Sequence, residues 1–306
     1  MNVNHISNLW IQRSAWLIAI RPKTLGAAVA PVLIGTALAI SDGMFHLLSC
    51  LLCFLASILI QIGTNFSNDY YDFLKGADTT ERLGPKRVTQ SGLLEPDAVK
   101  KLFIIVFGLA VLCGVFLVVR GGWPILLIGL LSIASGILYT GGPFPLAYHG
   151  FGDIFVLLFF GPIAVSGTYY VQALEWRELT ILAGLIPGLT ATALISINNL
   201  RDAPTDVKVN KRTLAVKFGE NFVRREIQFA LILSGVLPIL LVVMKPSQWP
   251  ALFSLLVLWP IFGVIKVVLS DTKGCELNVV LVTTGKILLI QSLLFSVGWT
   301  APVFLR

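Results

Sequence analysis

Long, nearly uncharged apolar stretches constrain this chain more than any other feature of its sequence. Nine of them, each 18 to 22 residues long, cover 22–41, 45–65, 99–119, 123–140, 151–172, 179–199, 227–244, 249–270 and 286–304. A helix needs ~20 apolar residues to cross a bilayer. Because the apolar residues are continuous rather than alternating, the spans are predicted to be helices and not strands of a β-barrel.

The composition excludes most other protein classes. Of the 306 residues, 56% are hydrophobic and only 13% are charged, which argues against a soluble domain, a disordered chain or a coiled coil. The sequence therefore predicts an all-α polytopic membrane protein that forms a single transmembrane domain over 1–306. Residues 1–21 are expected to be an amphipathic lead-in, with Trp10 and Trp16 at the membrane interface.

The distribution of basic residues predicts the orientation. The net charge is +7, and 18 of the 23 Lys and Arg residues lie in segments on the N-terminal side of the predicted membrane. The positive-inside rule then places the N-terminus in the cytoplasm, and nine spans place the C-terminus on the opposite side. The expected partner of this basic surface is anionic membrane lipid rather than nucleic acid.

Two long segments on the predicted cytoplasmic side, 66–98 and 200–226, begin with paired carboxylates. Asp69 and Asp72 are three residues apart, and Asp202 and Asp206 are four apart. Both spacings place a pair on one helix face if the preceding helix continues. Pro204 leaves that continuation open in the second pair, because proline is tolerated only in a first helical turn or at a break.

Paired carboxylates repel each other unless cations lie between them. Carboxylate and amide oxygens suit Mg²⁺, which completes its coordination with water and substrate phosphates. The Lys and Arg residues that follow both pairs indicate that an anion joins the metal. One such cluster alone is typical of a solvated loop. Two similar clusters on the same side favour a diphosphate held through Mg²⁺ between the two carboxylate pairs.

Asn65 to Asp72 follows the pattern N-x-x-x-D-x-x-D, and Asp202 to Asp206 follows D-x-x-x-D. These motifs resemble those of the UbiA superfamily of intramembrane prenyltransferases, and the resemblance covers nearly the whole chain. Segments 21–25, 68–72, 84–92, 139–143, 148–153, 198–202 and 211–214 are similar to the menaquinone-pathway branch that prenylates 1,4-dihydroxy-2-naphthoate. Many superfamily members carry a Lys shortly after Tyr139, where this chain has Gly141 to Pro143. Asn210 stands where Gly is common, and a turn with positive φ tolerates Asn.

The resemblance implies about nine helices around a lipid-open cavity, with two Mg²⁺ ions as the cofactor. The implied reaction transfers a polyprenyl group from an allylic polyprenyl diphosphate to 1,4-dihydroxy-2-naphthoate with decarboxylation, which gives a demethylmenaquinol.

Site residues follow from the two motifs and their basic neighbours. The predicted metal ligands are Asp69, Asp72, Asp202 and Asp206, supported by Asn65, Asn68 and Asn198. The predicted diphosphate contacts are Lys75, Arg87, Arg201 and Lys211, with Arg21 and Arg82 as further choices. The predicted contacts of the allylic cation and the aromatic acceptor are Tyr70, Tyr139, Tyr148 and His149. His149 could orient the acceptor or take a proton from it, and Asp153 is a similar candidate for that role.

Two alternatives remain open at this stage. The aspartate motifs are expected to bind the diphosphate and not the aromatic ring. An enzyme that transfers the prenyl group to another aromatic quinone precursor would therefore carry the same motifs. An anion or divalent-cation transporter is a different class with similar charges, but transporters are expected to show internal repeats and a site at the middle of the membrane.

Overall fold

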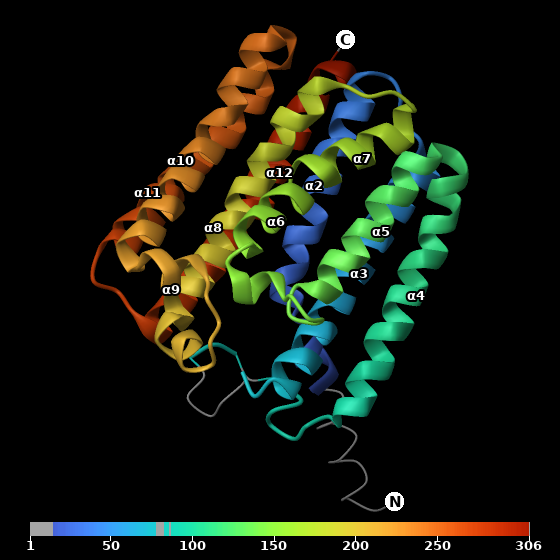
Figure 1. Ribbon diagram of the computed structural model, residues 1–306. Helices are drawn as coiled ribbons and strands as arrows, with labels where there is room; N and C mark the ends of the chain where they lie inside the picture. Colours follow the sequence, from blue (N-terminus) through green and yellow to red (C-terminus); the bar gives the residue numbers. More distant parts are fainter. Residues whose placement is uncertain (1–14, 78–82, 86, 306) are drawn as a thin grey trace, which may run out of the picture.

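The computed structural model describes residues 15–77, 83–85 and 87–305. All of the regular elements in these ranges are helices (Figure 1). In chain order they are α2 (Pro22–Ser41), α3 (Leu47–Leu74), α4 (Pro96–Gly121), α5 (Trp123–Leu138), η1 (Leu146–His149), α6 (Gly152–Phe159), α7 (Pro162–Ala173), α8 (Glu178–Lys208), α9 (Leu214–Phe218), α10 (Glu220–Met244), η2 (Pro246–Val257), α11 (Leu258–Leu269), η3 (Gly274–Glu276) and α12 (Leu277–Phe304). Residues 15–20 are also helical. Residues 1–14 of the predicted lead-in, which include Trp10, and Arg82 lie outside the described residues.

The predicted fold class is confirmed. Eight helical segments in the described part of the chain are long and apolar enough to cross a membrane, and the 16-residue α5 is a shorter apolar helix. Three of the eight combine two elements: α6 with α7 forms Gly152–Ala173, η2 with α11 forms Pro246–Leu269, and η3 with α12 forms Gly274–Phe304. Each of the nine predicted stretches thus has a helical counterpart, and the chain is an integral membrane protein.

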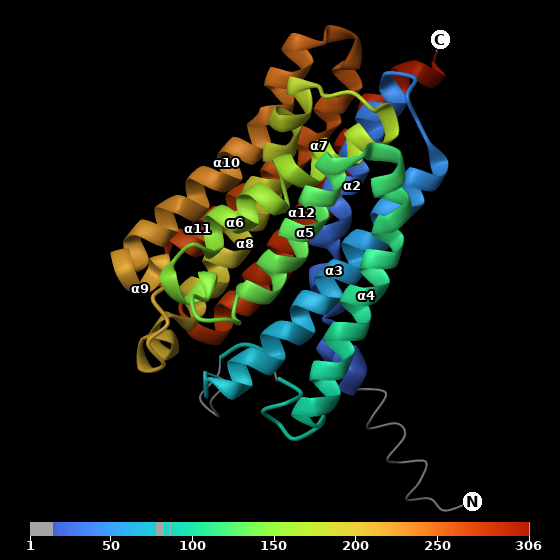
Figure 2. The same ribbon diagram turned by 45° about the vertical axis from the view of Figure 1, so that its right-hand side comes forward.

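The spanning helices run along one common direction in both views (Figures 1 and 2). The connection between α3 and α4 lies at the same end as α9, near the start of α2. The end of α12 lies at the opposite end. The two polar segments that follow the aspartate pairs are therefore brought together by the topology, although they are far apart in the sequence.

Three hydrophobic clusters of described residues hold the bundle together. The largest joins α2, α7, α8, α10, α11 and α12 around fully buried side chains such as Trp299, Phe295 and Leu241. The second joins α3 and α4 around Phe66 and Phe103, and the smallest joins α4, α5 and α7. Burying large side chains of this kind stabilises a fold by roughly 1.5–3 kcal/mol each in water, and in lipid close packing takes over that role.

The structure differs from the sequence expectation at the helix ends. The acidic clusters do not lie in loops over 66–98 and 200–226, because α3 continues to Leu74 and α8 continues to Lys208. Pro204 lies inside α8 and does not end it. Among the described residues, the non-helical parts reduce to 75–77, 83–85, 87–95, 209–213 and 219. Hydropathy falls before these helices stop, because their last turns carry the polar residues. For the same reason α12 begins nine residues before the exposed Lys286.

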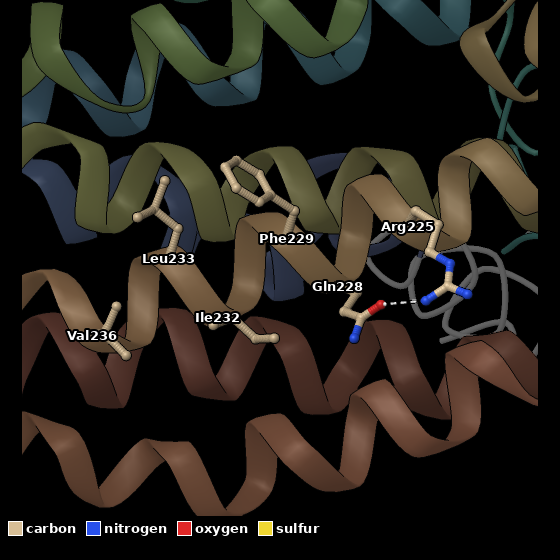
Figure 3. A pocket seen from close by; sticks show the side chains of 6 residues that line it. All are labelled: Arg225, Gln228, Phe229, Ile232, Leu233 and Val236. Atoms are coloured by element: carbon tan, nitrogen blue, oxygen red, sulfur yellow. Dashed lines mark hydrogen bonds between the residues drawn. The ribbon is translucent and has the colours of Figure 1, made fainter.

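The outer face of α10 illustrates how the bundle meets lipid. Figure 3 shows six side chains that line a shallow groove along this helix: Arg225, Gln228, Phe229, Ile232, Leu233 and Val236. Phe229 is 66% exposed, and Arg225 donates a 3.2 Å hydrogen bond to Gln228 at the end nearest the polar loops. An apolar stripe that ends in an arginine is typical of a helix that faces acyl chains and reaches the headgroups at one end.

Candidate active site

The first aspartate motif lies within the last three turns of α3. Asp69 and Asp72 are 2% and 6% exposed. Arg87, from the connection that follows, donates through Nη2 to Oδ2 of Asp72 at 3.0 Å, and its Nε lies 3.9 Å from Oδ1 of Asp69. The two carboxylates therefore share one helix face, as the spacing predicts, and the Arg87 guanidinium lies against both.

Two asparagines of the same motif fix the end of α3 to neighbouring segments. Nδ2 of Asn65 donates to the carbonyl of Ile20 at 2.9 Å and to Oγ1 of Thr24 at 3.1 Å. Oδ1 of Asn68 accepts a 2.9 Å hydrogen bond from Thr140. Arg21, in a left-handed conformation with φ of 54°, caps α2 here, and its charge acts on Asp69. Residues from three segments thus surround the first motif.

The second motif lies within the last two turns of α8. Asp202 and Asp206 are 5% and 6% exposed and share one face, because the helix continues through Pro204. Arg201 donates to both oxygens of Asp202, from Nε and from Nη2, at 2.7 Å each. Its Nη2 also donates to Oδ1 of Asn198 at 2.6 Å. This two-point geometry holds the carboxylate in one orientation.

The two motifs face each other across the polar end of the bundle. The charge of Asp72 acts on Asp206. Nζ of Lys211 lies 3.3 Å from Oδ1 of Asp206. Burial opposes the charge of Lys211, but attraction to Asp206, Asp72 and Asp202 outweighs it and raises the pKa of Lys211 above its ordinary value. One lysine therefore experiences carboxylates from both motifs, and Asn210 before it adopts the expected positive φ of 55°.

The connection between α5 and α6 covers the first motif. The hydroxyl of Tyr148 donates to Oδ1 of Asp72 at 3.0 Å. Nζ of Lys75 lies 4.7 Å from the centroid of the Tyr148 ring and donates to the carbonyl of Thr140 at 2.6 Å. Burial lowers the pKa of Lys75, although Asp72 acts in the opposite direction. Tyr139 lies within reach of the charges of Asp72, Asp206 and Asp153.

The donor set fits Mg²⁺. Oδ1 of Asp69 and Oδ2 of Asp206 are buried and have no hydrogen-bond partner among the described residues. Within those residues no three His, Cys, Asp or Glu side chains converge into a closed metal cage. Mg²⁺ does not need such a cage, because it is typically held by one or two carboxylates plus water and substrate phosphates. Paired carboxylates with unused oxygens supply that arrangement once on each motif.

Other predicted residues lie further from the carboxylates. Tyr70 packs against Tyr71 and Phe103, with ring centroids 5.1 and 5.8 Å away. His149 stacks on Phe144 at 3.7 Å, and its Nδ1 lies 2.9 Å from the carbonyl of Pro145. None of these contacts involves a motif carboxylate, so the roles of Tyr70 and His149 stay predictions, as does that of Arg82.

Three residues near the motifs escape the sequence reasoning. Asn278 of α12 accepts a 2.8 Å hydrogen bond from Nη1 of Arg201 and donates to the carbonyl of Leu83 at 3.2 Å. Thr140 contacts both Asn68 and Lys75. A Cβ at Gly84 would lie 2.6 Å from Nη2 of Arg201. In the sequence, these positions are marked only by an amide or a glycine beside an apolar span. That pattern does not identify the residue that each of them contacts.

Comparison with known proteins places this geometry in a family. The model of the UbiA prenyltransferase family matches residues 28–281, which include both aspartate motifs. The chain belongs to the UbiA prenyltransferase family. As a UbiA prenyltransferase it carries the two carboxylate pairs described above at the polar end of the bundle.

Curated relatives of this UbiA protein include two named 1,4-dihydroxy-2-naphthoate octaprenyltransferase. The protein of Escherichia coli (strain K12) is 42% identical over 217 residues, which cover 69% of this chain and 70% of the relative. The protein of Mycobacterium tuberculosis is 34% identical over 287 residues, which cover 91% of this chain and 94% of the relative. The likeness to the second relative thus extends over nearly the whole length of both chains.

Solved structures support the fold. A UbiA homolog from Archaeoglobus fulgidus bound to DMAPP and Mg²⁺ superimposes with a TM-score of 0.66 over 95% of this chain and 99% of that chain, at 16% identity. A structure of digeranylgeranylglyceryl phosphate synthase gives a TM-score of 0.62 at 17% identity, with the same coverage. At 16–17% identity, these comparisons support the helical fold and nothing further about this chain.

Proposed function

We propose that this UbiA prenyltransferase transfers a polyprenyl group from an allylic polyprenyl diphosphate to 1,4-dihydroxy-2-naphthoate, with loss of CO₂, and so forms a demethylmenaquinol. The observation that carries the proposal is the pair of buried aspartate motifs facing each other, with Lys211 in reach of both. The names of the two relatives above support the acceptor. Transfer to a different aromatic ring is the alternative that the aspartates alone leave open.

The motifs are assigned to the metal and the diphosphate. Asp69 and Asp72 would hold one Mg²⁺, and Asp202 and Asp206 a second, with Asn65, Asn68 and Asn198 fixing the helix ends. Bound Mg²⁺ supplies positive charge that stabilises the diphosphate as it leaves. The Archaeoglobus fulgidus homolog binds Mg²⁺ together with DMAPP, which supports this choice of metal.

Basic side chains complete the diphosphate site. We assign Lys75 and Lys211 to direct contact with phosphate oxygens, because both ammonium groups lie at the motif ends beside carboxylates. Arg87, which lies against Asp72 and Asp69, would also contact the diphosphate. Arg201 is already held by Asp202, Asn198 and Asn278, so its main role is to orient Asp202.

The reaction balances without an added oxidant or base. The C–O bond of the allylic diphosphate breaks, and its electron pair leaves with the diphosphate. The allylic carbon then bonds to the ring carbon that bears the carboxylate. The C–C bond to the carboxylate breaks, CO₂ leaves, and that electron pair restores the aromatic ring. Because the bundle is apolar, it shields the allylic cation from water, and the prenyl tail extends among the lipid-facing helices.

The positive-inside bias supports an orientation for this reaction. We propose that the loops at 75–95 and 209–213 face the cytoplasm of a bacterium, where a soluble naphthoate reaches them, and that the C-terminus lies across the inner membrane. We treat 1–306 as one transmembrane catalytic domain. Membrane lipid, the polyprenyl diphosphate and the naphthoate are the expected partners.

The test is a transfer assay with purified protein in liposomes. It receives 1,4-dihydroxy-2-naphthoate or 4-hydroxybenzoate, an allylic diphosphate, and Mg²⁺ or EDTA. Prenylated naphthoquinol and CO₂ are expected in equal amounts with Mg²⁺, and neither is expected from Asp69→Ala or Asp202→Ala. Product from hydroxybenzoate alone would contradict the acceptor, and no transfer by folded protein to any ring would contradict the reaction.

A further inference from the structure

A second set of acidic side chains lies outside the two motifs, where α6, α8 and α10 meet. Asp153 belongs to the first turn of α6, Ser196 to α8 and Glu226 to α10. We call these three residues the acid cluster. Oγ of Ser196 donates to Oδ1 of Asp153 at 2.9 Å, and Ser196 also interacts with the carboxylate of Glu226. The charge of Asp153 acts on Glu226.

The acid cluster has fewer hydrogen-bond donors than acceptors, and its donors are the Ser196 hydroxyl and the backbone N–H of Asp153. Asp153 is 5% exposed and Ser196 is fully buried. Oδ2 of Asp153 and Oε2 of Glu226 are buried atoms without a hydrogen-bond partner in the described ranges, and neither carboxylate has an ion pair there. Ser196 carries one hydroxyl proton, yet its oxygen also lies 2.9 Å from the carbonyl of Thr192. One proton cannot satisfy all of these acceptors.

Buried acceptors without donors are costly, and two neighbouring carboxylates add their repulsion. A ligand that brings O–H groups would supply the missing donors and relieve both costs. A phosphate or a carboxylate would not, because it brings more negative charge. The chemistry of the acid cluster therefore selects a hydroxylated ligand.

Backbone packing holds the acid cluster in place. A Cβ at Gly161, between α6 and α7, would lie 2.8 Å from the carbonyl oxygen of Gly184 and 2.9 Å from Cα of Gly188 in α8. Only glycine permits this approach, which brings α6 against α8. Asp153 precedes Gly161 by eight residues, and Ser196 follows Gly188 by eight residues. The two side chains meet about two helical turns from the contact.

Tyr139 connects the acid cluster to the aspartate motifs. A Cβ at Gly152, the residue before Asp153, would lie 3.0 Å from the Tyr139 hydroxyl oxygen. The charges of Asp153, Asp72 and Asp206 all act on this phenol. The acid cluster therefore lies beside the diphosphate site, with the Tyr139 ring between them.

We infer that Asp153, supported by Ser196 and Glu226, accepts a hydrogen bond from a phenolic hydroxyl of the aromatic acceptor. This inference rests on the proposed function. A carboxylate that accepts from the hydroxyl raises the electron density of the ring and turns one ring face toward the allylic carbon. The hydroxyl keeps its proton, because loss of CO₂ already supplies the electron pair. Ser196 positions Asp153 through its hydroxyl, and Glu226 acts on Asp153 through that same hydroxyl and through its charge. Specificity for hydroxylated rings follows.

The test separates the acceptor from the donor. In liposomes, Asp153→Asn replaces the carboxylate by an amide of the same shape. The KM for 1,4-dihydroxy-2-naphthoate is expected to rise at least about tenfold, the loss typical of one hydrogen bond to a charged group. The KM for the allylic diphosphate is expected to stay within about twofold, because its contacts lie on the motifs.

Inhibition constants identify the hydroxyl. 1-Hydroxy-2-naphthoate and 4-hydroxy-2-naphthoate, which each lack one hydroxyl, serve as competitive inhibitors of the wild type and of Asp153→Asn. For one of them the variant is expected to bind as tightly as the wild type, since the contact is already missing. Equal weakening of both inhibitors and of the substrate in the variant would overturn the inference.

Serine variants provide the matched control. Ser196→Ala is expected to raise the acceptor KM. Ser234→Ala removes an equally buried hydroxyl that bonds Thr190 and Gln291 away from the acid cluster, and it should leave both KM values unchanged. Glu226→Gln replaces Asp153→Asn as the test variant if the latter does not fold. If the wild type prenylates no hydroxylated ring, the proposed function fails. If it does and both KM values shift equally in the variant, only this inference fails.

Discussion

Arg201 holds the carboxylate of its own neighbour, Asp202, with Nε and Nη2 each 2.7 Å from one carboxylate oxygen. The same guanidinium reaches Asn198 of α8 and Asn278 of α12. Arg201 is 1% exposed, so this network is among the most buried polar arrangements near the motifs. The second aspartate motif is therefore oriented by one side chain that also joins two spanning helices.

Arg201→Lys tests this orienting role. Lysine keeps the charge but cannot donate from two fixed points to one carboxylate. We expect kcat/KM to fall by at least about tenfold, because loss of a charged hydrogen bond costs about 1.5–3 kcal/mol. Arg225→Lys, on the exposed face of α10, is the matched control and should change neither kcat/KM nor Tm. Wild-type kinetics in Arg201→Lys would contradict the role.

Gly84→Ala tests the hydrogen-bond network of Arg201 by crowding its guanidinium from the connection between α3 and α4. The added Cβ would lie 2.6 Å from Nη2 and 3.0 Å from Cζ of Arg201, so the guanidinium must shift. We expect a loss of activity similar to that of Arg201→Lys, measured as kcat/KM. A Cβ at Gly108 in α4 meets nothing within 4 Å, and Gly108→Ala should retain full activity. Equal activity of the two alanine variants would show that the connection relaxes freely.

Tyr148→Phe removes the 3.0 Å hydrogen bond to Asp72 and keeps the ring beside Lys75. We expect the Mg²⁺ concentration for half-maximal activity to rise by at least about tenfold, since a hydrogen bond to a charged group contributes about 1.5–3 kcal/mol. Tyr170→Phe removes a hydroxyl that donates to the carbonyl of Gly121 at 3.0 Å and should leave the Mg²⁺ requirement unchanged. The prediction fails if both variants behave alike.

The fall of kcat/KM at alkaline pH (the alkaline limb of the pH profile) is expected to follow deprotonation of Lys75. Burial lowers the pKa of Lys75, so its positive charge is lost at a lower pH than that of an exposed lysine. Binding of the anionic donor then weakens as pH rises, and kcat/KM for the donor falls. Arginine stays protonated throughout, so Lys75→Arg is expected to move the limb to higher pH. Lys101→Arg, on the surface of α4, should not move it. Identical limbs in all three proteins would contradict the assignment.

The sequence carries the local part of this architecture and little of the rest. Continuous hydropathy identifies the spans, and spacing places Asp69 with Asp72 and Asp202 with Asp206 on shared faces. Polar residues in the last turns conceal where α3 and α8 end, because hydropathy reports the membrane and not the helix. Contacts such as Arg201 with Asn278, 77 residues apart, depend on tertiary packing, which no local pattern encodes.

The acid cluster shows the same limit. Asp153 stands near His149 in a polar segment, where the sequence suggests an acceptor contact for either residue. The structure directs His149 onto Phe144 and Asp153 onto Ser196. Glu226 gives no sequence signal, since it follows Arg224 and Arg225 in what resembles an ordinary charged loop. Its partner is revealed only when α10 packs beside α8.

The central claim is that the two aspartate motifs bind one diphosphate together. Its most direct test is the affinity for a non-reactive allylic thiodiphosphate with Mg²⁺, measured for wild type, Asp72→Asn, Asp206→Asn and the double variant. Each single change is expected to weaken binding by roughly tenfold or more, and the double variant by clearly less than the product of the two, as for groups that share a ligand. Binding losses that multiply, or a single variant that binds as tightly as wild type, would contradict the claim.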